Sequence, residues 1–220
     1  MPSKAQDRFA DNSEDIKRLL DIHGDVGGDE RGRRWGLEVL NKSGVVLVCA
    51  FWEAFCEDLA FEALEHLVSN AKNYKGLPKR LQQQVATELK DDRDQLAVWR
   101  LADEGWRAHL RTRMEKLQDQ LNRELNTPKS APVDDFFERS VGISGISNSW
   151  KWPRMSNERA KARLDEFVTL RGDIAHRGKA SEATKKKAVT DFLSHVTQLV
   201  TKTDDCVNAS VDTACGVRLW

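Results

Sequence analysis

The stretch "VLVCAFWEAFCEDL", residues 46–59, decides the fold class, because it is strongly apolar and has a helical period. Apolar residues recur three or four positions apart within it and on both sides of it, at Val45, Val46, Val48, Cys49, Trp52, Cys56, Leu59, Ala63 and Leu67. Such spacing is typical of one face of an α-helix. We therefore predict a long helix from about Trp35 to Asn70 at the centre of the core.

The remaining segments also have a period near 3.6 residues, and the chain contains only five prolines. This pattern predicts an all-α protein. The expected elements are an N-terminal helix over Ala5–Ile22, helical sequence over Lys79–Asn126 as one helix or as two joined near Gly105, a helix after an N-cap at Ser156, and a last helix from near Ser181.

No linker divides the chain, so we expect a single domain over residues 1–220. Residues 1–34 are expected to form the N-terminal helix and a glycine-rich turn. Residues 35–205 then form the helical core, and residues 206–220 form a tail.

Composition limits the partners. The 220 residues include 35 basic and 35 acidic ones, so the chain as a whole has no field that attracts nucleic acid, and any such site must be local. The longest apolar run, Val45–Trp52, is shorter than the roughly 20 residues that span a bilayer. The N-terminus lacks the features of a secretory signal. We expect a cytoplasmic protein with no membrane partner.

The four cysteines, Cys49, Cys56, Cys206 and Cys215, have no CxxC spacing and no histidines arranged as in a zinc finger. Cys49 and Cys56 lie seven residues apart on one helical stripe, which favours packed thiols. We expect neither a metal site nor a cofactor.

Glu53 lies inside the apolar stripe of the central helix. A carboxylate among apolar neighbours is costly unless it is paired or hydrogen-bonded. Two interpretations are open: Glu53 has a cationic or donor partner, or it lies at the edge of the stripe and reaches water.

The stretch "LRGDIAHRG", residues 170–178, combines an arginine and a histidine. Arg171 continues an apolar stripe, whereas His176 lies about 140° away around a regular helix. Either the two side chains do not cooperate within one protomer, or the helix is distorted between them. Gly172 is the natural place for a distortion, and Gly178 can cap the helix.

Arginine and histidine suit cleavage of RNA without a metal. Histidine titrates near neutral pH and can move the proton of a ribose 2′-hydroxyl or of the leaving oxygen, and a guanidinium can stabilise the charge on phosphorus oxygens. The spacing alone is common by chance.

The same stretch, between an amphipathic helix and a final helix, resembles the Arg-x4-6-His signature of the HEPN superfamily. Together with "VLVCAFWEAFCEDL" and "FFERSVGISGIS", residues 136–147, it resembles the RiboL-PSP-HEPN branch. The resemblance covers about Trp35 to Asp205, with the N-terminal helix and the tail outside it. It implies a HEPN-type helical bundle with an additional N-terminal helix.

The resemblance also implies a homodimer in which the Arg and His of both protomers form a metal-independent endoribonuclease. Arg171 would bind the scissile phosphate and His176 would act as general base or acid. Asp173 would orient His176 or pair with Arg171, and Glu53 would hold Arg171 in place. Family members commonly have a polar residue after the arginine, where this chain has Gly172.

Two basic clusters are candidates for RNA contacts. The one beside the arginine and histidine consists of Arg177, Lys179, Lys185, Lys186 and Lys187, and the other consists of Lys72, Lys75, Lys79 and Arg80. The two glycines at Gly142 and Gly145 have the spacing of a phosphate-binding loop, but no Lys-Ser or Lys-Thr follows them.

We therefore predict a toxin or antiphage ribonuclease that leaves a 2′,3′-cyclic phosphate and has an antitoxin or defence-system partner. The alternative is a non-catalytic HEPN module for dimerisation, nucleotide binding or partner-protein binding, with His176 packed or hydrogen-bonded. A third interpretation is a regulatory subunit whose long helices bind a partner protein.

Overall fold

A computed structural model describes residues 2–27, 37–124, 127–177 and 184–220, and these residues form α-helices without a β-strand. The predicted all-α fold is confirmed. The helices are α1 (Lys4–Gly27), α2 (Glu38–Asn70), α3 (Lys79–Lys90), α4 (Gly105–Glu124), α5 (Ser130–Val141), α6 (Asn157–Arg177) and α7 (Lys186–Cys215), with short 3-10 helices at Tyr74–Gly76, Ala97–Leu101 and Ile146–Ser149.

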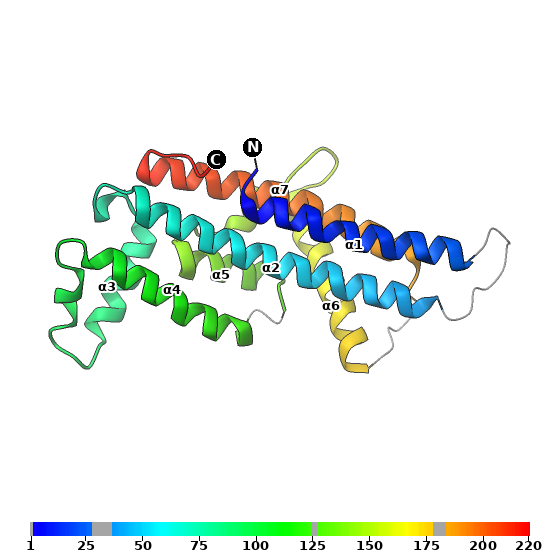
Figure 1. Ribbon diagram of the computed structural model, residues 1–220, viewed down its shortest axis with the longest axis horizontal. Coiled ribbons are helices and arrows are strands. Elements are labelled where there is room, and N and C mark those ends of the chain that lie inside the picture. The colour runs from blue at the N-terminus through cyan, green and yellow to red at the C-terminus, as the bar shows by residue number, and fades with distance from the viewer. Residues whose placement is uncertain (1, 28–36, 125–126, 178–183) are drawn as a thin grey trace.

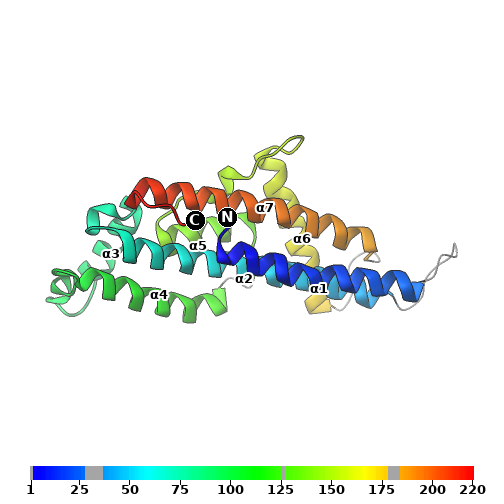
Figure 2. The same cartoon turned by 45° about the horizontal axis from the view of Figure 1, so that its top comes forward.

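Helix α2 forms the centre of the core, as the apolar stretch predicts. It lies beside α1 and α7 along the long axis of the molecule, with α5 packed against it as well (Figures 1 and 2). Trp52 is fully buried and its indole nitrogen donates to the carbonyl of Pro128, 3.1 Å away. Its ring stacks on Phe55 and meets Trp150 edge to face. These rings join α2 to the loops on either side of α5.

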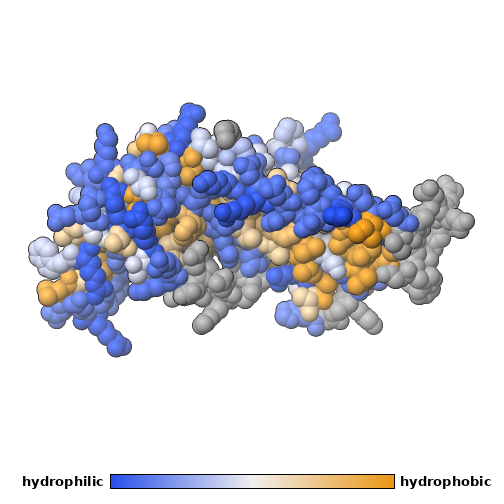
Figure 3. All heavy atoms as spheres, viewed as in Figure 1, coloured by the Kyte–Doolittle hydropathy of each residue, from blue (hydrophilic) through white to orange (hydrophobic). Residues whose placement is uncertain are grey.

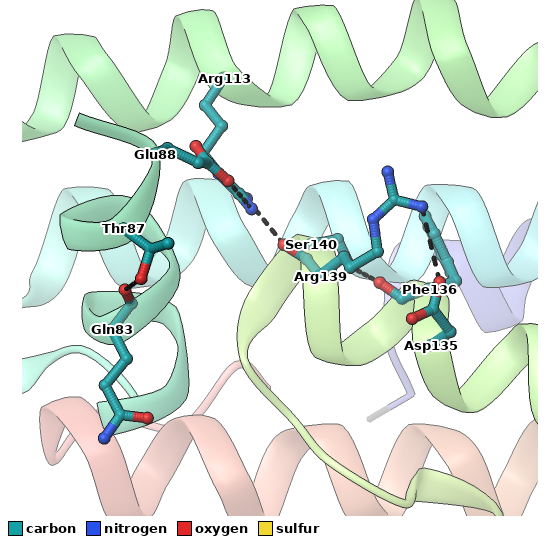
Figure 4. A network of polar contacts seen from close by, with 8 residues as sticks. All are labelled: Gln83, Thr87, Glu88, Arg113, Asp135, Phe136, Arg139 and Ser140. Carbon is teal, nitrogen blue, oxygen red and sulfur yellow. Dashed lines mark hydrogen bonds and ion pairs between the residues drawn. The ribbon is translucent and has the colours of Figure 1, made fainter. Parts of the chain in front are cut away.

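Helices α3 and α4 lie at one end of the bundle, and a buried arginine joins them to α5 (Figure 4). The side chain of Arg113 on α4 is 8% exposed. Its guanidinium donates to both carboxylate oxygens of Glu88 on α3 and to the carbonyl of Arg139 on α5, 2.7 Å away. One side chain thus ties three helices together.

The expected helical segment from Lys79 to Asn126 is two helices rather than one. Helix α3 ends at Lys90, and α4 begins at Gly105, the junction named above. At Gly105 a Cβ atom would lie 2.3 Å from the carbonyl oxygen of Arg100, so a larger residue would collide with the connecting segment. The start of the central helix near Trp35 lies outside the described residues.

The expectation of a tail over residues 206–220 is wrong. Helix α7 continues to Cys215 because its buried apolar stripe extends to Val207 and Val211. Gly216, with φ 74°, ends the helix, and the backbone N–H of Leu219 then donates to the Asn208 side chain, 3.0 Å away. The last residues fold back onto the bundle.

The N-terminal helix is an integral part of the bundle. The hydroxyl of Ser3 donates to the buried carboxylate of Asp204 on α7, and the backbone N–H of Ala5 donates to Glu62 on α2, 3.2 Å away. Burial raises the pKa of Asp204 to about 6. Within the described ranges, no helix is both long and apolar enough to cross a membrane.

Candidate active site on helix α6

Helix α6 carries both candidate catalytic residues, and it is regular over its whole length. Ser156 precedes it, and the backbone N–H of Arg159 donates to the Ser156 hydroxyl, 3.4 Å away, as an N-cap. Of the two alternatives stated above, a distortion at Gly172 is absent, because α6 continues without a break to Arg177. A Cβ atom at Gly172 would meet nothing within 4 Å, so this glycine faces open space. The proposed cap at Gly178 lies outside the described residues.

Arg171 lies against the central helix α2. Its Nη2 atom is 3.7 Å from Oε2 of Glu53, and the two side chains are 22% and 21% exposed. The guanidinium also lies close enough to the thiol of Cys49, one turn before Glu53, to lower the pKa of that thiol. The structure therefore gives the carboxylate in the apolar stripe a cationic partner, while leaving it a partial route to water.

Burial shifts the pKa values of the groups around this ion pair. Burial, reinforced by the neighbouring carboxylate of Glu57, raises the pKa of Glu53 to about 7 although Arg171 acts in the opposite direction. Burial likewise raises the pKa of the Cys49 thiol to about 11 even beside a guanidinium. Cys49 is therefore a protonated packing residue and not a nucleophile.

His176 is exposed in the last turn of α6, and so is not packed as the non-catalytic alternative expects. On a regular helix it lies about 140° around the axis and about 7.5 Å along it from Arg171. One side chain contacts α2 while the other points elsewhere. The C-terminal end of α6 extends beyond α2, away from the rest of the bundle (Figure 1).

Asp173, expected to support Arg171 or His176, and Lys186 of the nearby basic cluster have different surroundings. Asp173 is half-buried and precedes His176 by three residues, which places it on the side of His176 rather than on that of Arg171. Nζ of Lys186 donates to the carbonyl of Leu20 on α1, 2.7 Å away, so this lysine joins two helices.

Of the other residues in this basic cluster, the structure describes the side chains of Lys185 and Lys187 only. Lys187 pairs with Asp191 at 2.6 Å, and Lys185 is the N-cap residue of α7. The side chain of Arg177 and the whole of Lys179 lie outside the described residues. Elsewhere in the described chain, no group of three His, Cys, Asp or Glu side chains is close enough to hold a metal ion.

Sequence reasoning missed the contact between Cys49 and Arg171. A signal for it exists, because Cys49 and Glu53 are four residues apart and share a helical face. An arginine that reaches one of them from a crossing helix lies within reach of the other.

An all-helical bundle with an arginine held by a carboxylate and an exposed histidine on one helix defines a candidate phosphodiester site. The chain matches the RiboL-PSP-HEPN family over residues 7–209 and belongs to that family. HEPN domains are typically ribonucleases or nucleotide-binding modules. No curated protein and no solved structure matches the chain. The match includes most of α1, so the expectation that the N-terminal helix lies outside the family region is wrong.

Proposed function

We propose that the protein is a metal-independent endoribonuclease, with Arg171 and His176 as its catalytic residues. One observation carries the proposal: the ion pair with Glu53 fixes Arg171 at the surface of α2, while His176 on the same helix is exposed to solvent. A guanidinium that is held in place and partly shielded from water stabilises negative charge on phosphate oxygens.

The proposed reaction needs no group beyond these side chains and the substrate. Neutral His176 removes the proton of a ribose 2′-hydroxyl, and the 2′-oxygen attacks the adjacent phosphorus. Arg171 stabilises the added negative charge on the phosphorus oxygens. The bond to the 5′-oxygen breaks, that oxygen takes up a proton from a protonated histidine, and the products are a 2′,3′-cyclic phosphate and a 5′-hydroxyl.

We further propose that two copies of the chain form the complete site. On a regular helix Arg171 and His176 diverge within one protomer, and a two-fold axis can bring residues of two copies together. Helix α2 offers a suitable face. Its buried residues are almost all apolar, and Val39, which is 62% exposed, shares one face with the exposed Ala50 and Ala54.

This apolar face lies beside the candidate site. Val39, Val46, Ala50 and Ala54 are separated by seven, four and four residues, so they share one side of α2. By the same spacing Ser43 and Glu57 lie on this side as well, and Glu53 lies at its edge. Hydrophobic side chains gather over the N-terminal half of α2 (Figure 3). We propose a second copy as the occupant, because only a second copy supplies the missing half of the site.

A ribonuclease of this kind damages the RNA of its own cell when it is unrestrained. We therefore propose a toxin or antiphage role, with an antitoxin or defence-system protein as the restraining partner. The four cysteines are free thiols, which fits the reducing cytoplasm in which such a role is exercised.

Expression in growing cells tests the proposed function. We expect the wild-type chain to arrest growth and fragment RNA, and the His176→Ala variant, made to the same level, to do neither. His176 is exposed, so its replacement leaves the fold intact. Growth arrest by both forms, or RNA fragmentation by neither, would contradict the proposal. Nucleotide binding without cleavage would instead support the non-catalytic alternative.

A further inference from the structure

Two segments that are far apart in the sequence line one hollow of about 630 Å³ beside the C-terminal part of α7. One segment contributes Lys75 of the 3-10 helix before α3 and Lys79, the first residue of α3, and the loop after α5 contributes Ser144. Ser210 and Thr213 of α7 line the other side. We call this hollow the α3–α7 groove. Helix α3 and the C-terminal end of α7 lie at one end of the molecule, whereas α7 begins toward the other end (Figure 1).

Gly142 brings the two loops together. It ends α5 with φ 75°, and a Cβ atom there would lie 2.7 Å from the backbone nitrogen of Leu81 in the first turn of α3. Only glycine allows this approach without strain. Gly142 therefore has a packing role, and it brings the loop that carries Ser144 against the start of α3.

The α3–α7 groove is lined by basic and neutral side chains. Lys75 and Lys79 are exposed, and none of the described residues that line the groove is acidic. Of the carboxylates around it, Glu138 pairs with Arg80 at 2.7 Å and Asp212 with Arg218 at 3.4 Å, and Asp134 accepts from the hydroxyl of Ser147 at 2.6 Å. Asp205 also lies near the lining residue Cys206.

The other groups at the groove add no positive charge. The α3 helix begins at Lys79 without a side-chain cap, but Gly142 packs against the backbone nitrogen of Leu81 in its first turn. The hydroxyls of Ser210 and Thr213 donate to carbonyls of their own helix, each at 2.8 Å, and bring no charge. The two lysines therefore supply the positive charge of the groove.

We infer that the α3–α7 groove binds the phosphate backbone of RNA, as a second contact area separate from Arg171 and His176. The inference rests on the proposed function, because it assigns a path to the same substrate. Lysine ammonium groups on flexible stems act as point charges on phosphates and read no sequence, so the groove contributes affinity and not base specificity.

Charge reversal in the groove tests the inference. Binding of a labelled 20-nucleotide single-stranded RNA is measured by fluorescence anisotropy over a range of salt concentrations, with His176→Ala in every form to prevent cleavage. We expect Lys75→Glu/Lys79→Glu to weaken binding about tenfold at low salt. The slope of log affinity against log salt should fall by about 1.4, since each phosphate contact on a single strand contributes about 0.7.

The control variant is Lys17→Glu/Lys90→Glu, which makes the same change in net charge at exposed lysines outside the groove. A glutamate at position 79 stands in the first turn of α3, where a negative charge stabilises a helix, so loss of folding is not expected. Equal binding by the groove variant and the control variant would overturn the inference while leaving the proposed function intact.

Two further measurements separate the possible outcomes. With His176 restored, we expect the groove variant to cleave a dinucleotide at the wild-type rate but to have a raised KM for the 20-nucleotide RNA. If the wild type cleaves neither substrate, the proposed function fails. If ATP binds the wild type and not the groove variant while RNA binding is unchanged, the groove is a nucleotide site and the assignment to RNA is overturned.

Discussion

Glu53 occupies a position where the apolar period of α2 demands a hydrophobic side chain, and the structure shows the consequence. Burial raises the pKa of Glu53 to about 7 from an ordinary value near 4.5. The folded chain therefore holds this proton more tightly than the unfolded chain does. Its contribution to the free energy of unfolding is largest at low pH and is lost as the pH rises through about 4.5 to 7.

We predict that Glu53→Gln removes this part of the pH dependence. The wild-type protein should lose free energy of unfolding between pH 5 and pH 8 relative to the variant, because only the wild type must ionise a buried carboxyl. Urea unfolding followed by circular dichroism at both pH values gives the comparison. The pKa of Asp204 is also raised, but this is common to both proteins, so its effect on the free energy of unfolding cancels in the comparison. Identical changes in the two proteins would contradict the assignment of the shifted pKa to Glu53.

We expect substitution by alanine to change the free energy of unfolding in opposite directions at Gly142 and at Gly172. Gly142→Ala should lower the free energy of unfolding by about 1–3 kcal/mol, because of its positive φ and its contact with Leu81. Gly172→Ala should raise it by roughly 0.5–1 kcal/mol, since α6 is regular there and the space is open. Thermal or urea unfolding measures both. Destabilisation by Gly172→Ala would show that α6 requires a special conformation at this position.

At the scale of elements, the helices with a clear 3.6-residue period could be predicted from the sequence. Helix α2 and the Ser156 cap of α6 are examples. The sequence left one helix or two joined near Gly105 as open alternatives, because the choice depends on a close approach between Gly105 and the Arg100 carbonyl that no local pattern records. The end of α7 was placed too early, since its stripe continues through Val207 and Val211 into sequence that lacks a long apolar run.

Part of the candidate site could also be predicted from the helical period of the apolar residues. An apolar stripe interrupted by Glu53 indicates a need for a cation, and the stripe of α6 that ends on Arg171 supplies one. The unbroken course of α6 through Gly172 was not predictable, because glycine lowers helix preference without forbidding a helix. Contacts such as that of Lys186 with α1 depend on the tertiary fold and have no sequence signal.

The junction of α3, α4 and α5 depends on Arg113, and a second arginine two residues away on α4 provides a matched comparison. We predict that Arg113→Ala lowers the free energy of unfolding by about 1–3 kcal/mol, because it leaves the Arg139 carbonyl without its donor and removes the pair with Glu88, whose side chain is 48% exposed. Arg111→Ala removes an exposed pair with Glu65 and should cost less than about 1 kcal/mol. Equal effects of the two substitutions on urea unfolding would contradict the central role of Arg113.

At the scale of the whole molecule, an elongated bundle exposes one apolar face of its own core helix. If a second copy covers this face, charges placed on it should separate the copies without unfolding the chain. We predict that Val39→Glu/Ala50→Glu is a folded monomer and that the wild type is a dimer, as measured by light scattering after size-exclusion chromatography.

The matched control is Leu96→Glu/Val98→Glu, which places the same charges at residues 66% and 57% exposed near the α3 and α4 end. This variant should remain a dimer. A dimer that persists with charges at Val39 and Ala50, or a wild type that is a monomer, would rule out this face as the dimer interface.

The central claim is that Arg171 and His176 cleave RNA without a metal, and RNA cleavage in excess EDTA tests it most directly. Purified wild-type protein should release fragments that end in a 2′,3′-cyclic phosphate. Arg171→Ala and His176→Ala should each be slower by about 100-fold or more, the loss expected for a phosphate-stabilising group or an acid-base group. Equal cleavage by all three proteins, or no cleavage by the wild type, would contradict the claim.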